Sequence, residues 1–284
     1  MNAIEINHLT KQFDKFTLND ISFSLPRGTV MGLIGENGAG KSTTIKLLLG
    51  LLHADSGSLS MLGLSPAKNE LEIKRRLGVV SEVTAHPLNY RVRDTGRVLS
   101  TAYPAWDDAA FLRYLKLFDV DPAKKCKDLS KGMRMKLSIA CALCHGAELL
   151  ILDEPTSGLD PLVRDEVLDI LRDFMQDDQH SILLSSHITS DLEKIADYIT
   201  FLHKGRVLFS KSLLDLQESY GVLRCTHDMV QDFAPGTVYA ERRDQFGAEV
   251  LVDPRRLPAG LTAEPASIEQ IMLFLTRYAA RKEG

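Results

Sequence analysis

The chain has 284 residues, of which 44% are hydrophobic and 25% charged, which is ordinary usage for a globular protein. Its net charge is −4 and it has no block of lysines and arginines, so the composition does not predict a nucleic-acid surface. No apolar run approaches the roughly 18 residues of a membrane-spanning helix, and the first residues lack the apolar core of a signal peptide. We therefore expect the chain to stay in the cytoplasm.

The first two thirds of the chain alternate strand-like and helix-like segments. Residues 3–9 and 18–25 alternate like strands, with breakers at Asn19-Asp20 and at residues 26–28. Three later segments read as short, buried apolar strands, and residue 77 begins another. These buried segments are residues 29–34, 149–152 and 181–185. Helices are expected over residues 42–52 and 163–175, and this alternation predicts a mostly parallel sheet covered on both faces.

Two segments stand apart from this alternation. Residues 83–146 are helical in character and read as an insertion. Residues 215–284 differ in composition and are expected to form a small accessory domain with two or three strands and a closing helix. That helix begins with the capping box Ser267–Gln270 and carries an apolar stripe, which packs on its own domain or, alternatively, contacts a partner.

Gly35-Glu36-Asn37-Gly38-Ala39-Gly40-Lys41-Ser42 has the pattern of a phosphate-binding loop. It follows a predicted buried strand and precedes a helix, so backbone N–H groups from Gly38 to Ser42 can converge on phosphate oxygens. Lys41 would reach the β- and γ-phosphates, and the Ser42 hydroxyl would bind Mg²⁺. The alternative is an ordinary glycine-rich turn. With Thr43, these residues are the predicted ATP site.

An apolar strand from Leu149 ends in two carboxylates, Asp153 and Glu154. Strand ends of this kind lie at the carboxyl edge of a parallel sheet, where ligands bind. Asp153 fits the Mg²⁺ shell, and Glu154 fits a general base that polarises the attacking water. The alternative is a helix N-cap followed by an acidic turn.

Leu129-Ser130-Lys131-Gly132-Met133 opens a predicted helix and resembles the signature of ABC-type ATPases. In that family the segment covers the γ-phosphate held by a partner subunit. The usual family residues are Gly at 131 and Gln at 133, so this chain departs from the pattern at two positions. A plain helix N-cap is the alternative.

The resemblance extends to four further places in the chain. Ser157-Gly158-Leu159-Asp160 looks like the loop through which each subunit senses the other, and His187 looks like the histidine that contacts the γ-phosphate. Phe13 lies where the family has an aromatic that stacks on adenine. Glu82 stands where the family normally has a Gln that binds Mg²⁺ and links the site to the transmembrane partner. The substitution puts the affinity for Mg²⁺ and the coupling of the site to that partner in question.

The resemblance covers residues 1–214 and implies a P-loop NTPase fold: a RecA-like, mostly parallel core, an antiparallel β subdomain and a helical insertion at about 83–146. It implies an ATPase that uses ATP and Mg²⁺, pairs with a second copy of itself and serves a separate transmembrane permease, with no nucleic-acid partner. The chain would lie on the inner face of the membrane, with residues 83–106 as the expected docking surface. Residues 129–161 look most like subunits serving peptide, antimicrobial or phenol-soluble-modulin exporters. Residues 265–270 and the helix that follows are similar to the tails of ABC-2-type exporter ATPases. The alternative is a non-transport ATPase acting on DNA or ribosomes.

Four cysteines suit a reducing compartment. Cys141 and Cys144 form a C-x-x-C pair within an apolar helical run, and no second pair lies at zinc-ligand spacing. We expect both to be small buried helix residues, with zinc or redox chemistry as the alternative.

Overall fold

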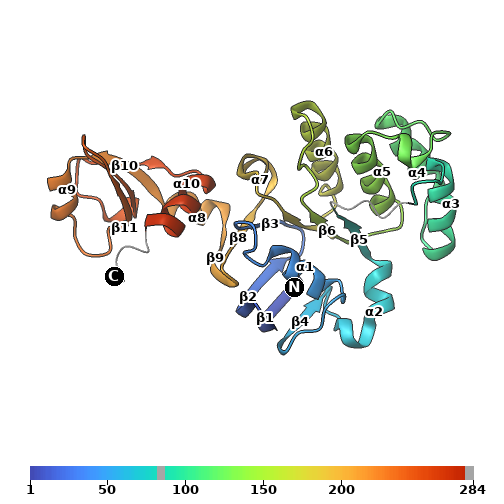
Figure 1. The fold of residues 1–284 in the computed structure, drawn as a ribbon, viewed down its shortest axis with the longest axis horizontal. Helices are drawn as coiled ribbons and strands as arrows, with labels where there is room; N and C mark the ends of the chain where they lie inside the picture. Colours follow the sequence, from blue (N-terminus) through green and yellow to red (C-terminus); the bar gives the residue numbers. More distant parts are fainter. Residues whose placement is uncertain (82–86, 279–284) are drawn as a thin grey trace. The chain divides into compact units, whose positions relative to one another are not determined.

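The computed structural model describes residues 1–81 and 87–278 and consists of two compact units, Met1–Leu208 and Phe209–Gly284 (Figure 1). The division falls within a single strand, β9 (Arg206–Ser212). Each unit has its own sheet and its own buried residues.

The larger unit is built on a six-stranded sheet with the strand order β5-β6-β7-β3-β8-β9. Besides β9, its strands are β3 (Val30–Ile34), β5 (Leu77–Val80), β6 (Leu149–Asp153), β7 (Ser181–Ser185) and β8 (Tyr198–His203). The neighbours from β5 to β8 all pair in parallel. Apart from Val79 of β5, which is 41% exposed, most of their apolar side chains are buried, as expected for parallel strands covered on both faces. The predicted α/β class with a mostly parallel sheet is therefore confirmed.

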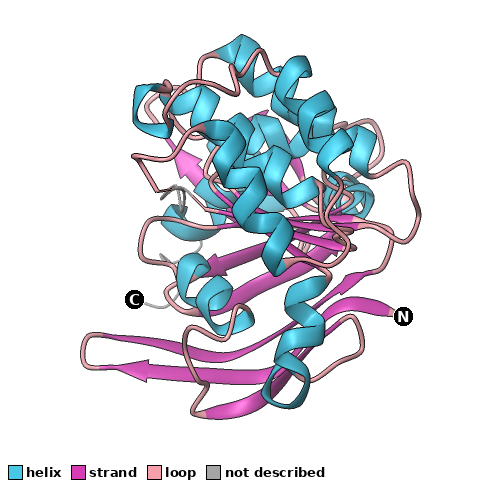
Figure 2. Cartoon of the chain, turned by 90° about the vertical axis from the view of Figure 1, so that its right-hand side faces the viewer, coloured by secondary structure: helices cyan, strands magenta, loops and turns pink. Residues whose placement is uncertain are grey.

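An antiparallel sheet of order β2-β1-β4 forms a second layer of this unit. Its strands are β1 (Asn2–Phe13), β2 (Phe16–Pro26) and β4 (Ser56–Met61). Helix α1 (Lys41–Leu48) shares one apolar core with both sheets. The long antiparallel strands run along the lower part of Figure 2.

The predicted break at Asn19-Asp20 is wrong, because both residues lie inside β2. Asp20 has a φ of 53°, and the pairing of β1 with β2 shifts its register beside it. The turn-forming residues therefore make an irregularity within the strand, since Asp tolerates a left-handed backbone better than most residues.

The remaining helices of this unit follow the expected alternation. They are α2 (Pro66–Arg75), α3 (Val92–Ala102), α4 (Asp108–Leu117), α5 (Lys131–Leu143), α6 (Pro161–Phe174) and α7 (Thr189–Ile195), with a short 3-10 turn η1 (Cys126–Asp128). Three of them, α3, α4 and α5, come from the stretch predicted to be a helical insertion. In the described part of the chain, none of the helices combines the length and apolar character needed to cross a bilayer.

The smaller unit contains an antiparallel sheet of order β11-β12-β10-β13. Its elements are α8 (Leu213–Ser219), β10 (Gly221–Cys225), α9 (His227–Asp232), β11 (Val238–Arg243), β12 (Ala248–Val252), η2 (Pro254–Arg256), β13 (Glu264–Pro265), α10 (Ile268–Leu273) and a π-helical end, η3 (Phe274–Tyr278). The predicted capping box of α10 is present in both directions. Ile268 and Ile271 from the predicted stripe are buried, as packing on the unit's own sheet requires.

Candidate active site

Three neighbouring parallel strands bring the predicted site residues to one edge of the sheet. Strand β7 lies between β3, which precedes the phosphate-binding loop, and β6, which carries the two acids. In this register Ser185 at the end of β7 is opposite Asp153 on one side and Leu33 on the other. Segments more than a hundred residues apart therefore meet at the carboxyl edge, where α/β sheets bind ligands.

The phosphate-binding loop wraps around the ammonium group of Lys41. Its Nζ donates to the carbonyl oxygen of Gly35 at 2.7 Å and lies 3.5 Å from that of Glu36, and the residue is only 7% exposed. Residues 36–38 and Ser42 are exposed around it. The loop thus surrounds one buried cation with accessible backbone and with the first turn of α1, which suits an anionic ligand.

Gly40 is a loop position with a backbone conformation that favours glycine. Its φ is 116°, and a Cβ built there would lie 2.8 Å from Cδ1 of Leu18 and 3.2 Å from Cζ of Phe16. The glycine lets the loop pass against the β2 strand in a backbone conformation that other residues rarely adopt. This places the start of α1 directly after the loop.

Glu154 lies between two basic side chains. Its Oε2 is 2.6 Å from Nδ1 of His187, and its Oε1 is 3.9 Å from Nζ of Lys41. The Glu154 side chain is 16% exposed, whereas that of His187 is 55% exposed. The structure therefore brings together the three residues predicted to be catalytic, from three separate segments.

The two acids are anchored by Ser185, a residue that the sequence analysis did not identify. The Ser185 hydroxyl donates to Oδ1 of Asp153 at 2.5 Å. The backbone N–H of Glu154 donates to the Ser185 carbonyl oxygen at 3.1 Å and to its hydroxyl at 3.2 Å. A polar residue at the end of the apolar strand SILLS is the only sequence signal that could have pointed to it.

The predicted metal ligands have suitable chemistry for Mg²⁺. Asp153 offers a half-buried carboxylate, and Ser42 offers an exposed hydroxyl at the start of α1. Mg²⁺ prefers hard oxygen ligands and usually takes only one or two from the protein, with the rest from phosphates and water. Among the described residues, no cluster of three or more His, Cys, Asp or Glu side chains that could hold a metal ion occurs. The third predicted ligand, Glu82, lies outside the residues that the structure describes.

The signature segment packs beside the predicted inter-subunit loop of the same chain. The Ser130 hydroxyl caps α5 by accepting from the N–H of Met133 at 3.1 Å, and Leu129 is buried beneath it. A Cβ added to Gly158 would lie 2.8 Å from Nζ of Lys131. One added to Gly132 would lie 3.4 Å from Cγ1 of Val163 in α6. Gly158 thus leaves room for the Lys131 side chain, whereas a Cβ at Gly132 would make an ordinary van der Waals contact.

The remaining predicted residues are exposed or half-buried. Phe13 ends β1 with 40% exposure, and its ring stacks on that of Phe16 with the centroids 6.4 Å apart. Asp160 caps α6, since its Oδ1 accepts from the N–H of Val163 at 3.1 Å. Ser157 lies within the turn after Glu154 and donates its N–H to the Glu154 carbonyl at 3.2 Å.

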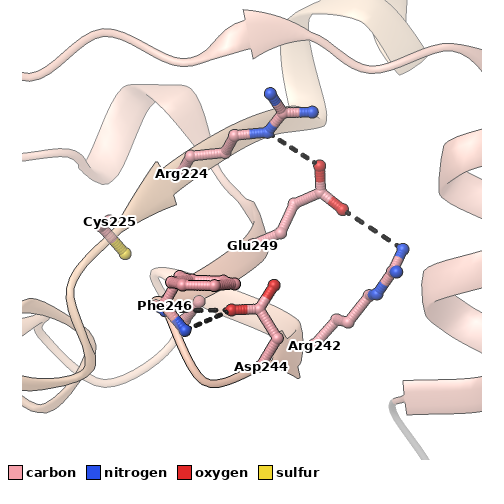
Figure 3. Close-up of a pocket in the computed structure, with 8 residues that line it drawn as sticks. Arg224, Cys225, Arg242, Asp244, Phe246 and Glu249 are labelled. Carbon is pink, nitrogen blue, oxygen red and sulfur yellow. Dashed lines mark hydrogen bonds and ion pairs between the residues drawn. The ribbon is translucent and has the colours of Figure 1, made fainter.

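A separate cavity of about 340 Å³ lies in the smaller unit (Figure 3). Arg224 and Arg242 approach Glu249 from either side, at 3.2 and 3.9 Å, and Asp244 closes the turn next to the exposed Phe246. The cluster thus balances its own charges. It contains none of the residues predicted to bind ATP.

The prediction for Cys141 and Cys144 is confirmed. Cys141 lies in α5 and Cys144 directly follows it, and the two are 7% and 2% exposed. Burial raises the pKa of the Cys144 thiol to about 12, with a smaller contribution from Asp107, and also raises the pKa of Cys141. Neither thiol is therefore ionised near neutral pH, as metal or redox chemistry would require.

Comparisons with known proteins find similar sequences and a similar structure. The ABC transporter family profile matches residues 18–157, which include the phosphate-binding loop, the signature and both acids. The chain is 36% identical over 211 residues to the lantibiotic transport ATP-binding protein SrtF of Streptococcus pyogenes, covering 73% of this chain and 90% of that protein. It is 32% identical over 301 aligned residues to the Nod factor export ATP-binding protein I of Burkholderia orbicola, covering 96% of each. A solved ATP-binding subunit of an ABC transporter superposes with a TM-score of 0.68 at 30% identity, covering 76% of this chain and 92% of that one.

Proposed function

The chain belongs to the family of ABC transporter ATP-binding proteins, and on that premise we propose that it powers export through a separate transmembrane permease. The single observation that carries the proposal is the position of Glu154. Its carboxylate lies beside Lys41 and His187 at the sheet edge where the phosphate-binding loop begins. A base held beside a phosphate-binding cation is what hydrolysis of a nucleoside triphosphate requires.

The chemistry assigns a role to each residue. Lys41 and the loop amides bind the phosphates, and Glu154 accepts a proton from the water that attacks the γ-phosphorus. The bond to the β,γ-bridging oxygen breaks, and ADP and phosphate leave. His187 donates a hydrogen bond to the γ-phosphate or to Glu154. Mg²⁺, held by Asp153, Ser42 and the predicted ligand Glu82, would neutralise charge on the phosphate oxygens. Phe13 would stack on the adenine.

Two copies of the chain are proposed to form the working unit. Ser130 and Lys131 are exposed at the start of α5, and residues 36–38 are exposed on the phosphate-binding loop. Exposed donors at a helix N-terminus suit a phosphate bound elsewhere, and the resemblance assigns that phosphate to the partner copy. Each ATP would then lie between one chain's loop and the other's signature, and the loop from Ser157 to Asp160 would sense the second site.

Export of an amphipathic or antimicrobial peptide is the proposed transport task. The similarity to a lantibiotic transport protein supports it, as does the likeness of residues 129–161 to peptide-exporter subunits. The permease would hold the chain at the inner face of the membrane, with the region around residues 83–106 as the docking surface. The relatives named above are transport proteins, which favours this proposal over an ATPase that acts on DNA or ribosomes.

The experiment is a pull-down of the tagged Glu154→Gln chain from detergent-solubilised membranes of its source cell with Mg-ATP. We expect a chain dimer and a multi-spanning protein in near-stoichiometric amount. The matched control adds Lys41→Ala to the same chain, which should raise the ATP concentration that the dimer requires. Recovery with ribosomes or DNA, and without a membrane protein, would overturn the transport proposal.

A further inference from the structure

Ser185 joins the two acids of the candidate site through one side chain. Its hydroxyl donates to Oδ1 of Asp153 at 2.5 Å and accepts from the N–H of Glu154 at 3.2 Å. The hydroxyl proton and one lone pair are therefore both used, in opposite directions, on adjacent residues.

The place of Ser185 in the sheet explains why it can make both bonds. It ends β7, the strand between the one that precedes the phosphate-binding loop and the one that carries the acids. It pairs directly with Asp153 in the parallel register and is completely buried. A short side chain there reaches the carboxylate without filling the space above the sheet edge.

The backbone of Glu154 shows that this anchoring restrains the base. Glu154 has a φ of 53°, in the left-handed region that non-glycine residues seldom occupy. Its N–H is shared between the hydroxyl and the carbonyl oxygen of Ser185. Such conformations persist when the surroundings hold them, and they concentrate at functional sites.

We propose that Ser185 is a positioning residue for ATP hydrolysis, which orients the Asp153 carboxylate toward the metal and fixes the backbone from which the Glu154 base projects. This inference rests on the proposed function of the site. The hydroxyl fixes Oδ1 of Asp153 and leaves Oδ2 for the metal shell. It also sets the direction in which Glu154 extends toward Lys41 and His187.

The competing explanation is that Ser185 has a purely structural role, as a buried hydroxyl that forms hydrogen bonds. Another buried serine of the same strand provides a control for the substitution. Ser181 begins β7, is equally buried, and its hydroxyl accepts from the N–H of Gly28 at 3.0 Å. It lies at the opposite end of the strand from the acids. Ser181→Ala therefore removes a comparable buried hydroxyl without touching the site.

The test compares Ser185→Ala, Ser185→Thr and Ser181→Ala in the full chain. For Ser185→Ala we expect kcat to fall at least about tenfold, as loss of a hydrogen bond to a charged group in the reacting site would cause. ATP affinity in EDTA should be unchanged, while the Mg²⁺ concentration that half-maximally supports the Glu154→Gln dimer should rise severalfold. Ser185→Thr, which keeps the hydroxyl, should restore most of kcat and most of the original Mg²⁺ dependence. Ser185→Cys, with a side chain of similar size and a weak donor, serves if the alanine variant does not fold.

The outcomes separate this inference from the function on which it rests. If the unaltered chain neither hydrolyses ATP nor forms the trapped dimer with Glu154→Gln, the proposed function fails. If both occur and Ser185→Ala behaves like Ser181→Ala in kcat and in Mg²⁺ dependence, only the role of Ser185 is overturned.

Discussion

The imidazole of His187 and the carboxylate of Glu154 are joined by a hydrogen bond of 2.6 Å, from Nδ1 to Oε2. The backbone N–H of His187 adds a second, longer bond of 3.3 Å to the same oxygen. His187, which follows β7, thus restrains the carboxylate of Glu154. Ser185, at the end of β7, restrains the backbone of the same residue. Both restraints on Glu154 come from one short stretch of chain.

We predict that His187→Ala lowers ATP turnover by about tenfold or more and leaves ATP affinity nearly unchanged. The reason is that the substitution frees the base without altering the phosphate-binding loop. Steady-state hydrolysis and equilibrium binding of a fluorescent ATP analogue measure the two effects. His8→Ala is the control, since His8 is an exposed imidazole that lies 2.8 Å from the Asp20 carboxylate, outside the site. Equal losses in both variants would contradict a catalytic role for His187.

Lys41→Ala should weaken ATP binding by about tenfold to a hundredfold, the range for removing a charge-assisted hydrogen bond. Lys41 is the buried cation of the loop, whereas Lys46 is an exposed lysine near the end of the same helix. Lys46→Ala should therefore bind ATP like the unaltered chain. Isothermal titration calorimetry provides the comparison, and an unchanged affinity for Lys41→Ala would remove Lys41 from the site.

The stability of the larger unit should depend on the ionisation of Glu148. Hydrogen bonds from Arg76 at 2.6 and 2.8 Å, opposed by burial and aided by the charges of Arg76 and Arg27, lower the pKa of Glu148. A lowered pKa in the folded state contributes stability that is present above the ordinary glutamate pKa and lost as the pH falls through the folded value.

Glu148→Gln should therefore cost about 1–3 kcal/mol of unfolding free energy at pH 7, and the difference should shrink as the pH falls below about 4. Urea unfolding at pH 7 and at successively lower pH measures this. Glu70→Gln, which removes an exposed partner of Lys74, should change the unfolding midpoint little at any pH. A pH-independent cost for Glu148→Gln would mean that the ion pairs with arginine are not its source.

Cys126, Cys141 and Cys144 should resist a thiol reagent at pH 8 until the protein unfolds. All three are buried, and burial raises the pKa values of Cys141 and Cys144, so almost no reactive thiolate exists. The half-buried Cys225 should be the most reactive of the four. Spectrophotometric thiol titration with and without guanidinium tests this, and rapid native labelling of Cys141 or stoichiometric zinc would revive the alternative of redox or metal chemistry.

Local patterns in the sequence predicted the class of the fold and the residue types of the candidate site. Apolar runs at residues 29–34, 149–152 and 181–185 predicted buried strands, and the structure has them at Val30–Ile34, Leu149–Asp153 and Ser181–Ser185, because parallel strands covered on both faces must be apolar. The loop from Gly35 to Ser42 and the acids Asp153 and Glu154 were recognisable because their spacing is set locally, within one turn or one strand end. The capping box of α10 was predictable for the same reason.

Which of these groups lie together depends on the order and register of the strands. The sequence analysis did not identify β4, β8 or β9. In β4 and in β9 only one residue is buried, so neither strand forms a continuous apolar run. It also gave no reason to select Ser185, since a serine at a strand end is locally unremarkable. The parallel register places that serine opposite Asp153, 32 residues earlier, and it brings His187 to Glu154. Hydrogen bonds of this kind depend on strand order, which hydrophobic periodicity along the chain does not encode.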